Sequence, residues 1–64
     1  MIGQNIRKLR KAKGLSQEKF ARLADMPFTT LNKIEIGDIK HPRIDTIGKI
    51  AGALKVKIDK LVNG

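Results

Sequence analysis

Cysteine, tryptophan and tyrosine are absent from these 64 residues, and histidine occurs once, as His41. Without cysteine, neither a disulfide nor a thiolate metal site can stabilise the chain, and a lone histidine gives no reason to expect a metal. Phe20 and Phe28 are the only aromatic residues, so aliphatic side chains must supply most of the core. A chain this short forms one small domain with limited buried surface. We therefore expect a single domain, residues 1–64, built from packed helices without a metal or another cofactor.

Acidic residues are few. Six Asp and Glu stand against fourteen Lys and Arg, which gives a formal net charge of +8. Such a charge favours polyanionic partners and speeds encounter with them. Charge alone leaves three interpretations open: a nucleic-acid partner, an acidic membrane surface, or a solvated basic surface that aids solubility.

Several kinds of functional signal are also missing. There is no signal peptide, long apolar run or lipidation motif, which predicts a cytoplasmic protein with no membrane partner. There is no glycine-rich phosphate loop and no carboxylate cluster with a plausible base. We therefore expect neither enzymatic activity nor a small-molecule substrate.

Apolar residues recur at spacings of three and four, which predicts helices rather than strands. Proline, glycine and short polar stretches divide the chain into about five helical pieces. We expect them over 3–13, from 17 to a break at 25–27, from there to about 36, over 44–54, and briefly around 58–62. Gly14 and Gly37 suit helix ends, and Ser16 suits a helix start.

This spacing assigns an inner face to each helix. The residues expected to face the core are Ile6, Leu9 and Ala12; Phe20, Leu23 and Ala24; Leu31 and Ile34; Ile44, Ile47, Ile50, Ala51 and Leu54; and Ile58, Leu61 and Val62.

The third helix has a polar and basic face opposite Leu31 and Ile34. That face carries Phe28, Thr29, Asn32, Lys33 and Ile36. Asn can bond bidentately to adenine, Lys can reach guanine, and Thr and Phe can touch the thymine methyl group. An ordinary solvent-exposed helix face is the alternative. Phe28 could also fold back into the core, and Ile36 could be merely exposed or could pack on the following loop.

Residues 15–37 carry a recognisable combination of features. Gln17 opens a helix, Phe20 and Ala21 lie on its inner side, Asp25-Met26-Pro27 breaks the chain, and Leu31 and Ile34 anchor the next helix. This pattern resembles the Cro/repressor-type helix-turn-helix family, with the motif at 16–36. The resemblance covers nearly the whole chain. It implies a compact all-α, five-helix, lambda-repressor-like domain.

The resemblance also implies roles for individual residues. Gln17 would contact a backbone phosphate and brace the first recognition residue. Arg10 and Glu35 match a structural ion pair between the first and third helices, since a partly buried carboxylate needs a partner. Lys40 and Arg43, with His41 between them, lie in the loop that holds the phosphate backbone in this family, and phosphate contacts set register without reading sequence.

Four positions depart from the family pattern. Asp25 stands where glycine with a positive φ is usual, at a cost of about 1–2 kcal/mol. Arg43 stands where Ser or Thr commonly caps the fourth helix. Gly48 and Gly52 lie four residues apart on that helix, and each costs about 1 kcal/mol against alanine. They could form a smooth strip for a partner helix at a dimer interface, pack tightly within the monomer, or have no structural role.

Together these features predict a sequence-specific, double-stranded DNA-binding transcription regulator, most simply a repressor, with the third helix in the major groove. One helix in one groove gives limited affinity, so we expect a homodimer on a palindromic site. The alternative is a protein-interaction module, or an antitoxin-like partner, that kept the fold but reads few bases.

Overall fold

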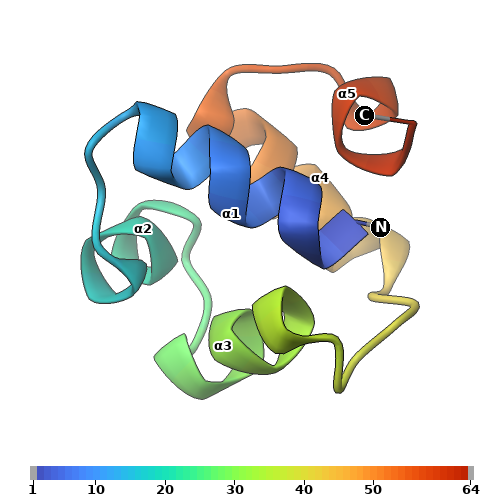
Figure 1. Cartoon of the computed structure of the whole chain (residues 1–64), viewed down its shortest axis with the longest axis horizontal. Coiled ribbons are helices and arrows are strands. Elements are labelled where there is room, and N and C mark those ends of the chain that lie inside the picture. Colours follow the sequence, from blue (N-terminus) through green and yellow to red (C-terminus); the bar gives the residue numbers. More distant parts are fainter. Residues whose placement is uncertain (1, 64) are drawn as a thin grey trace.

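Five helices joined by short loops make up residues 2–63, the part of the chain that the computed structural model describes (Figure 1). They are α1 (Ile2–Ala12), α2 (Gln17–Leu23), α3 (Phe28–Ile36), α4 (Ile44–Leu54) and α5 (Ile58–Val62). No strand occurs within residues 2–63. The prediction of an all-α, five-helix fold is confirmed, and the observed helix boundaries lie close to the expected ones.

The helix ends follow local backbone chemistry. Gly14 and Gly37 adopt left-handed conformations, with φ of 69° and 92°, just after α1 and α3. The Oγ of Ser16 accepts a hydrogen bond of 3.1 Å from the backbone N–H of Lys19, which caps α2. Asp25 has a φ of 54°, so it adopts the positive φ expected of it in the turn. Lys55 also has a positive φ, 58°, at the end of α4, which the sequence analysis did not predict.

The core is aliphatic around one buried aromatic ring. Helix α1 runs through the middle of the molecule (Figure 1) and packs against α3, α4 and α5, while α2 packs against α3. The side-chain amide of Asn5 donates a hydrogen bond of 2.8 Å to the Leu61 carbonyl, which ties α1 to α5. Complete burial of one large apolar side chain contributes about 1.5–3 kcal/mol to the free energy of unfolding. The fully buried large side chains are Ile6, Phe20, Leu31, Ile34, Ile50, Leu54 and Leu61.

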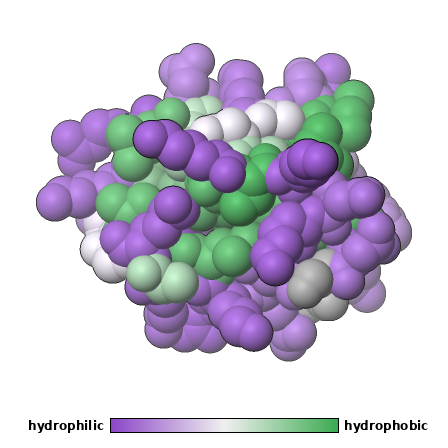
Figure 2. Space-filling model, turned by 90° about the horizontal axis from the view of Figure 1, so that it is seen from above, coloured by the Kyte–Doolittle hydropathy of each residue, from purple (hydrophilic) through white to green (hydrophobic). Residues whose placement is uncertain are grey.

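Several residues expected in the core lie at the surface instead. Leu23 is 62% exposed and Ile44 is 70% exposed. Leu23 ends α2 and Ile44 begins α4, so the apolar period extends past the part of each helix that another helix covers. The same holds for residues at other helix ends: Ala12, Ile58 and Val62. The view from above shows the outcome, with apolar surface in the middle broken by polar side chains (Figure 2).

The glycines in helices differ in their surroundings. A Cβ atom on Gly3 would collide with the backbone carbonyl oxygen of Ile34 and lie 3.1 Å from that of Glu35. Glycine therefore lets the start of α1 approach the end of α3 closely, a contact that the sequence did not reveal. A Cβ atom on Gly48 or Gly52 would meet nothing within 4 Å. Tight packing within the monomer, one interpretation of these two glycines, is therefore wrong.

Among residues 2–63, no helix combines the length and the apolar character that crossing a bilayer requires.

Candidate DNA interface

One face of α3 is open to solvent. Thr29 and Lys33 are exposed, and Asn32 is half-buried at the edge of that face. Phe28 is 44% exposed and Ile36 is 62% exposed. Phe28 therefore does not fold into the core, and Ile36 is not covered by the following loop. The five residues expected on this face are thus all at least partly accessible to a ligand.

Helix α3 is held at both ends by backbone conformation. Pro27, with φ −65° and ψ 141°, lies immediately before the helix, and its carbonyl accepts from the Leu31 N–H at 3.2 Å. Proline suits this place because the first N–H groups of a helix have no intrahelical partner. At the other end, the left-handed Gly37 donates to the Ile34 carbonyl at 3.3 Å. Helix α3 therefore begins and ends at defined residues, directly after Pro27 and directly before Gly37.

Arg10 and Glu35 form the expected ion pair between α1 and α3. Arg10 Nε lies 2.8 Å from Glu35 Oε2, and Arg10 Nη2 lies 2.9 Å from Glu35 Oε1. The two side chains are only 8% and 2% exposed. Arg10 Nη1 also donates to the Leu15 carbonyl at 2.7 Å. The Arg10 guanidinium therefore connects α1 to the segment before α2 and to α3. Its contact with Glu35 is bidentate, the geometry in which arginine–carboxylate pairs are strongest.

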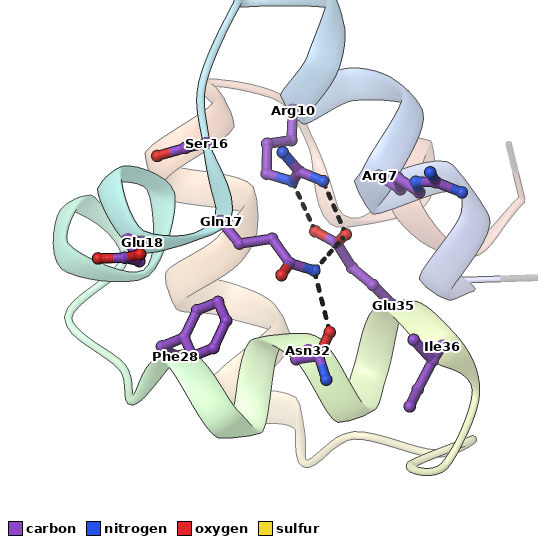
Figure 3. Close-up of a pocket in the computed structure, with 9 residues that line it drawn as sticks. All are labelled: Arg7, Arg10, Ser16, Gln17, Glu18, Phe28, Asn32, Glu35 and Ile36. Atoms are coloured by element: carbon purple, nitrogen blue, oxygen red, sulfur yellow. Dashed lines mark hydrogen bonds and ion pairs between the residues drawn. The ribbon is translucent and has the colours of Figure 1, made fainter.

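Gln17 extends this network toward the open face of α3 (Figure 3). Its Nε2 lies 3.0 Å from Glu35 Oε1 and 3.3 Å from Asn32 Oδ1. The side chain of Asn32 is therefore braced by the first residue of α2. The resemblance implied such bracing for the first recognition residue, whereas Asn32 lies one turn into α3, after Phe28 and Thr29. An amide nitrogen carries two hydrogens, so both donors of the Gln17 side chain are directed at protein oxygens. Its amide could donate to a phosphate only if one of these two bonds opened.

The loop between α3 and α4 carries the cations expected to meet the phosphate backbone. Lys40, His41 and Arg43 are all exposed there. Arg43 Nε lies 3.7 Å from an oxygen of Asp45, and both side chains are largely exposed. Exposed pairs of this kind contribute little, so Asp45 offers weak competition to an incoming phosphate. Arg43 also precedes α4 without capping it through its side chain.

Arg7 belongs with these residues, although the sequence analysis did not single it out. It lines an open cleft between α1, α2 and α3 together with Gln17, Asn32 and Ile36 (Figure 3). Residues three apart share one face of a helix. Since Arg10 was already expected to point at α3, the spacing could have placed Arg7 on the same side. Arg7 adds an exposed cation at the edge of the α3 face.

In the described part of the chain, no three His, Cys, Asp or Glu side chains gather where they could hold a metal ion. The accessible side chains of the α3 face, such as Phe28, Asn32 and Lys33, offer hydrogen-bond donors and acceptors, apolar contacts and positive charge.

The chain is similar to known proteins over most of its length. A family model described as helix-turn-helix matches residues 6–61. The HTH-type transcriptional regulator RghRB of Bacillus subtilis (strain 168), which is called uncharacterized, is 37% identical over 61 residues, or 95% of this chain and 44% of that protein. The HTH-type transcriptional regulator SinR of Bacillus licheniformis is 35% identical over 63 residues, or 98% of this chain and 57% of that protein. The chain spans about half the length of these two regulators.

Two solved structures agree closely with the fold. One is the crystal structure of SinR, described as the master regulator for biofilm formation, in complex with DNA. It has a TM-score of 0.94 and 34% identity, and the match covers 97% of this chain and 98% of that one. The other is the restriction-modification controller protein C.AhdI from Aeromonas hydrophila, with a TM-score of 0.89 and 37% identity, covering 94% and 89% of the two chains. The family match, the relatives and the five-helix fold agree: the chain belongs to the Cro/repressor-type helix-turn-helix family.

Proposed function

We propose that this protein is a transcription regulator that binds double-stranded DNA sequence-specifically, with α3 in the major groove. The observation that carries the proposal is the open α3 face, whose Asn32 is braced from within by Gln17 at 3.3 Å. The fold matches that of SinR, which is in complex with DNA, at a TM-score of 0.94. In helix-turn-helix proteins the second helix of the motif enters the major groove.

The residues divide into two groups by chemistry. Thr29, Asn32 and Lys33 would read base edges, and each good polar pair would discriminate by about 1–3 kcal/mol. Phe28 would touch a thymine methyl group, because its ring is exposed beside them. Lys40 and Arg43 would bind phosphates and set register. The net charge of +8 would add a salt-dependent attraction to every sequence.

We further propose that the protein binds as a homodimer on a palindromic operator. One short helix reads few base pairs, and a two-fold dimer doubles the site, with half-site centres about 34 Å apart. Exposed apolar side chains, such as those of Ile44 and Val62, offer surface that a second copy could cover. Repression is the simplest outcome, because a protein seated on an operator blocks other proteins from the same DNA.

Selection of bound sites from random DNA at fixed salt would test the proposal. We expect enrichment of one palindromic sequence, and a binding constant that falls steeply as salt is raised. Recovery of no enriched sequence would contradict base reading. Binding that ignores salt would favour the alternative, a protein-interaction module of the same fold.

A further inference from the structure

A continuous chain of hydrogen bonds runs from the interior to the open face of α3. It begins at the buried Arg10–Glu35 pair, passes through Gln17 and ends at Asn32 (Figure 3). The DNA-reading role proposed above needs only that Asn32 is accessible. The order of donors and acceptors along this chain also determines how the Asn32 amide is oriented, because each side chain fixes whether the next one must donate or accept.

The first link fixes which end of the Gln17 amide faces inward. Arginine is only a donor, and the carboxylate of an ion pair is only an acceptor. Glu35 Oε1, which already accepts from Arg10 Nη2 at 2.9 Å, can therefore only accept from Gln17. The two ends of an amide have nearly the same shape, so their neighbours decide which end points where. Gln17 must place Nε2 against Glu35, as it does at 3.0 Å.

The second link fixes Asn32 in the same way. The other hydrogen of Gln17 Nε2 faces Asn32, so Asn32 must offer an oxygen, and Oδ1 lies there at 3.3 Å. The amino group of Asn32 then points away from Gln17 (Figure 3). The buried ion pair thus dictates, through two intervening bonds, that Asn32 shows a donor to a ligand on the α3 face.

We propose that Asn32 reads DNA as a hydrogen-bond donor of fixed polarity, and that Arg10, Glu35 and Gln17 are positioning residues for this specificity. This inference rests on the proposed function and names the base edge that Asn32 selects. Guanine presents two acceptors, O6 and N7, in the major groove, whereas cytosine presents the N4 donor. The bidentate contact with adenine requires Oδ1 to face the base as well, but Oδ1 is turned toward Gln17. Guanine is therefore the preferred base at this position, and cytosine is the least favoured.

Binding to four duplexes tests the base preference. They differ only at the base pair whose preference disappears in Asn32→Ala, and salt is held fixed. The unmodified protein should bind guanine tightest and cytosine weakest, with about a tenfold or larger difference. In Asn32→Asp, the carboxylate still accepts from Gln17 but shows an acceptor to the base, so cytosine should move from last to first. A preference of the unmodified protein for adenine or cytosine overturns the proposal.

Gln17→Met tests the relay, since methionine has similar length but no amide. Asn32 should then turn freely, and the guanine–cytosine difference should shrink to about threefold or less while the rankings at other base pairs persist. An unchanged difference in folded Gln17→Met overturns the relay. If that variant does not fold, the rates at which the side-chain amide hydrogens of Gln17 and Asn32 exchange in the unmodified protein decide.

Nuclear magnetic resonance of the free protein separates this proposal from the proposed function. The side-chain amide hydrogens of Gln17 should exchange slowly with water, and those of Asn32 quickly. The reverse order overturns the relay whether or not DNA binds. The protein could also show the expected order, slow exchange for Gln17 and fast exchange for Asn32, and yet select no DNA sequence. That result would contradict the proposed function and the base preference, but it would support the fixed orientation of the Asn32 amide.

Discussion

Arg10 grips both oxygens of Glu35, at 2.8 and 2.9 Å, and thereby joins the first helix to the helix proposed to read DNA. The pair is almost fully removed from water. Salt screens buried pairs much less than exposed ones, so the pair should persist under the ionic conditions that weaken phosphate contacts. Salt that weakens the proposed phosphate contacts should therefore leave the position of α3 relative to α1 unchanged.

Removing one partner of this pair should destabilise the fold strongly. Arg10→Ala leaves a buried carboxylate unpaired, which costs about 3–5 kcal/mol. A domain of this length is stable by roughly 3–10 kcal/mol, so the urea midpoint should fall sharply or folding should be lost. Lys11→Ala, at the exposed neighbouring position, should change stability by less than about 0.5 kcal/mol. Joint replacement, Arg10→Met with Glu35→Leu, should restore most of the loss, and equal effects of Arg10→Ala and Lys11→Ala would argue against a structural role.

Two glycine-to-alanine changes should have opposite signs. Gly3→Ala places a Cβ against the Ile34 carbonyl, so α1 must shift, at a cost of about 1–3 kcal/mol. Gly48→Ala adds a Cβ where nothing lies within 4 Å and should raise stability by about 0.5–1 kcal/mol. Thermal unfolding followed by circular dichroism measures both. A stabilised Gly3→Ala would mean that the helices do not approach closely, and weaker self-association of Gly48→Ala would place that position at a contact between copies.

The turn of the motif should improve with glycine. Asp25 has a φ of 54°, a conformation that costs a non-glycine residue about 1–2 kcal/mol. Asp25→Gly should therefore raise the free energy of unfolding by up to ~1 kcal/mol. Asp25→Ala should lower it, because alanine suits a positive φ poorly. Denaturant titration distinguishes the two, and identical effects would show that the backbone conformation does not matter.

Base-reading and phosphate-binding residues should fail differently. Asn32→Ala should relax the preference at one base pair and weaken the selected site by about 1–3 kcal/mol. Lys40→Ala should weaken every sequence alike and reduce the slope of log K against log salt by about one unit. Fluorescence anisotropy on selected and scrambled duplexes over a salt series separates these patterns. Equal loss on all duplexes from Asn32→Ala would contradict its reading role.

The helices and the pairing of Arg10 with Glu35 could be predicted from the sequence. The signals for the helices lie within a few residues of one another, and the signal for the pair lies in the chemical type of its two residues. Apolar spacing, Ser16 and Gly37 each act within one turn of helix. A carboxylate on an inward face needs a cation, and the family resemblance indicated which one.

Other features depended on which neighbour covers which residue. The exposure of Leu23 and Ile44 follows from where adjoining helices stop, and the constraint on Gly3 follows from a backbone distant in sequence. The direction of the Gln17 amide required the positions of Glu35 and Asn32 together. None of these is encoded in the spacing of a single helix.

The hydrogen bonds of Arg10 also affect how the molecule opens locally. The guanidinium of Arg10, which belongs to the last turn of α1, binds the Leu15 carbonyl and the carboxylate of Glu35 in the second half of α3. Local opening that releases any one of these segments must break bonds that hold the others. Proteins open in cooperative units, and this side chain merges three segments into one such unit. Backbone amides of α1 and of the second half of α3 should therefore exchange with deuterated solvent in a single shared event, rather than fraying helix by helix.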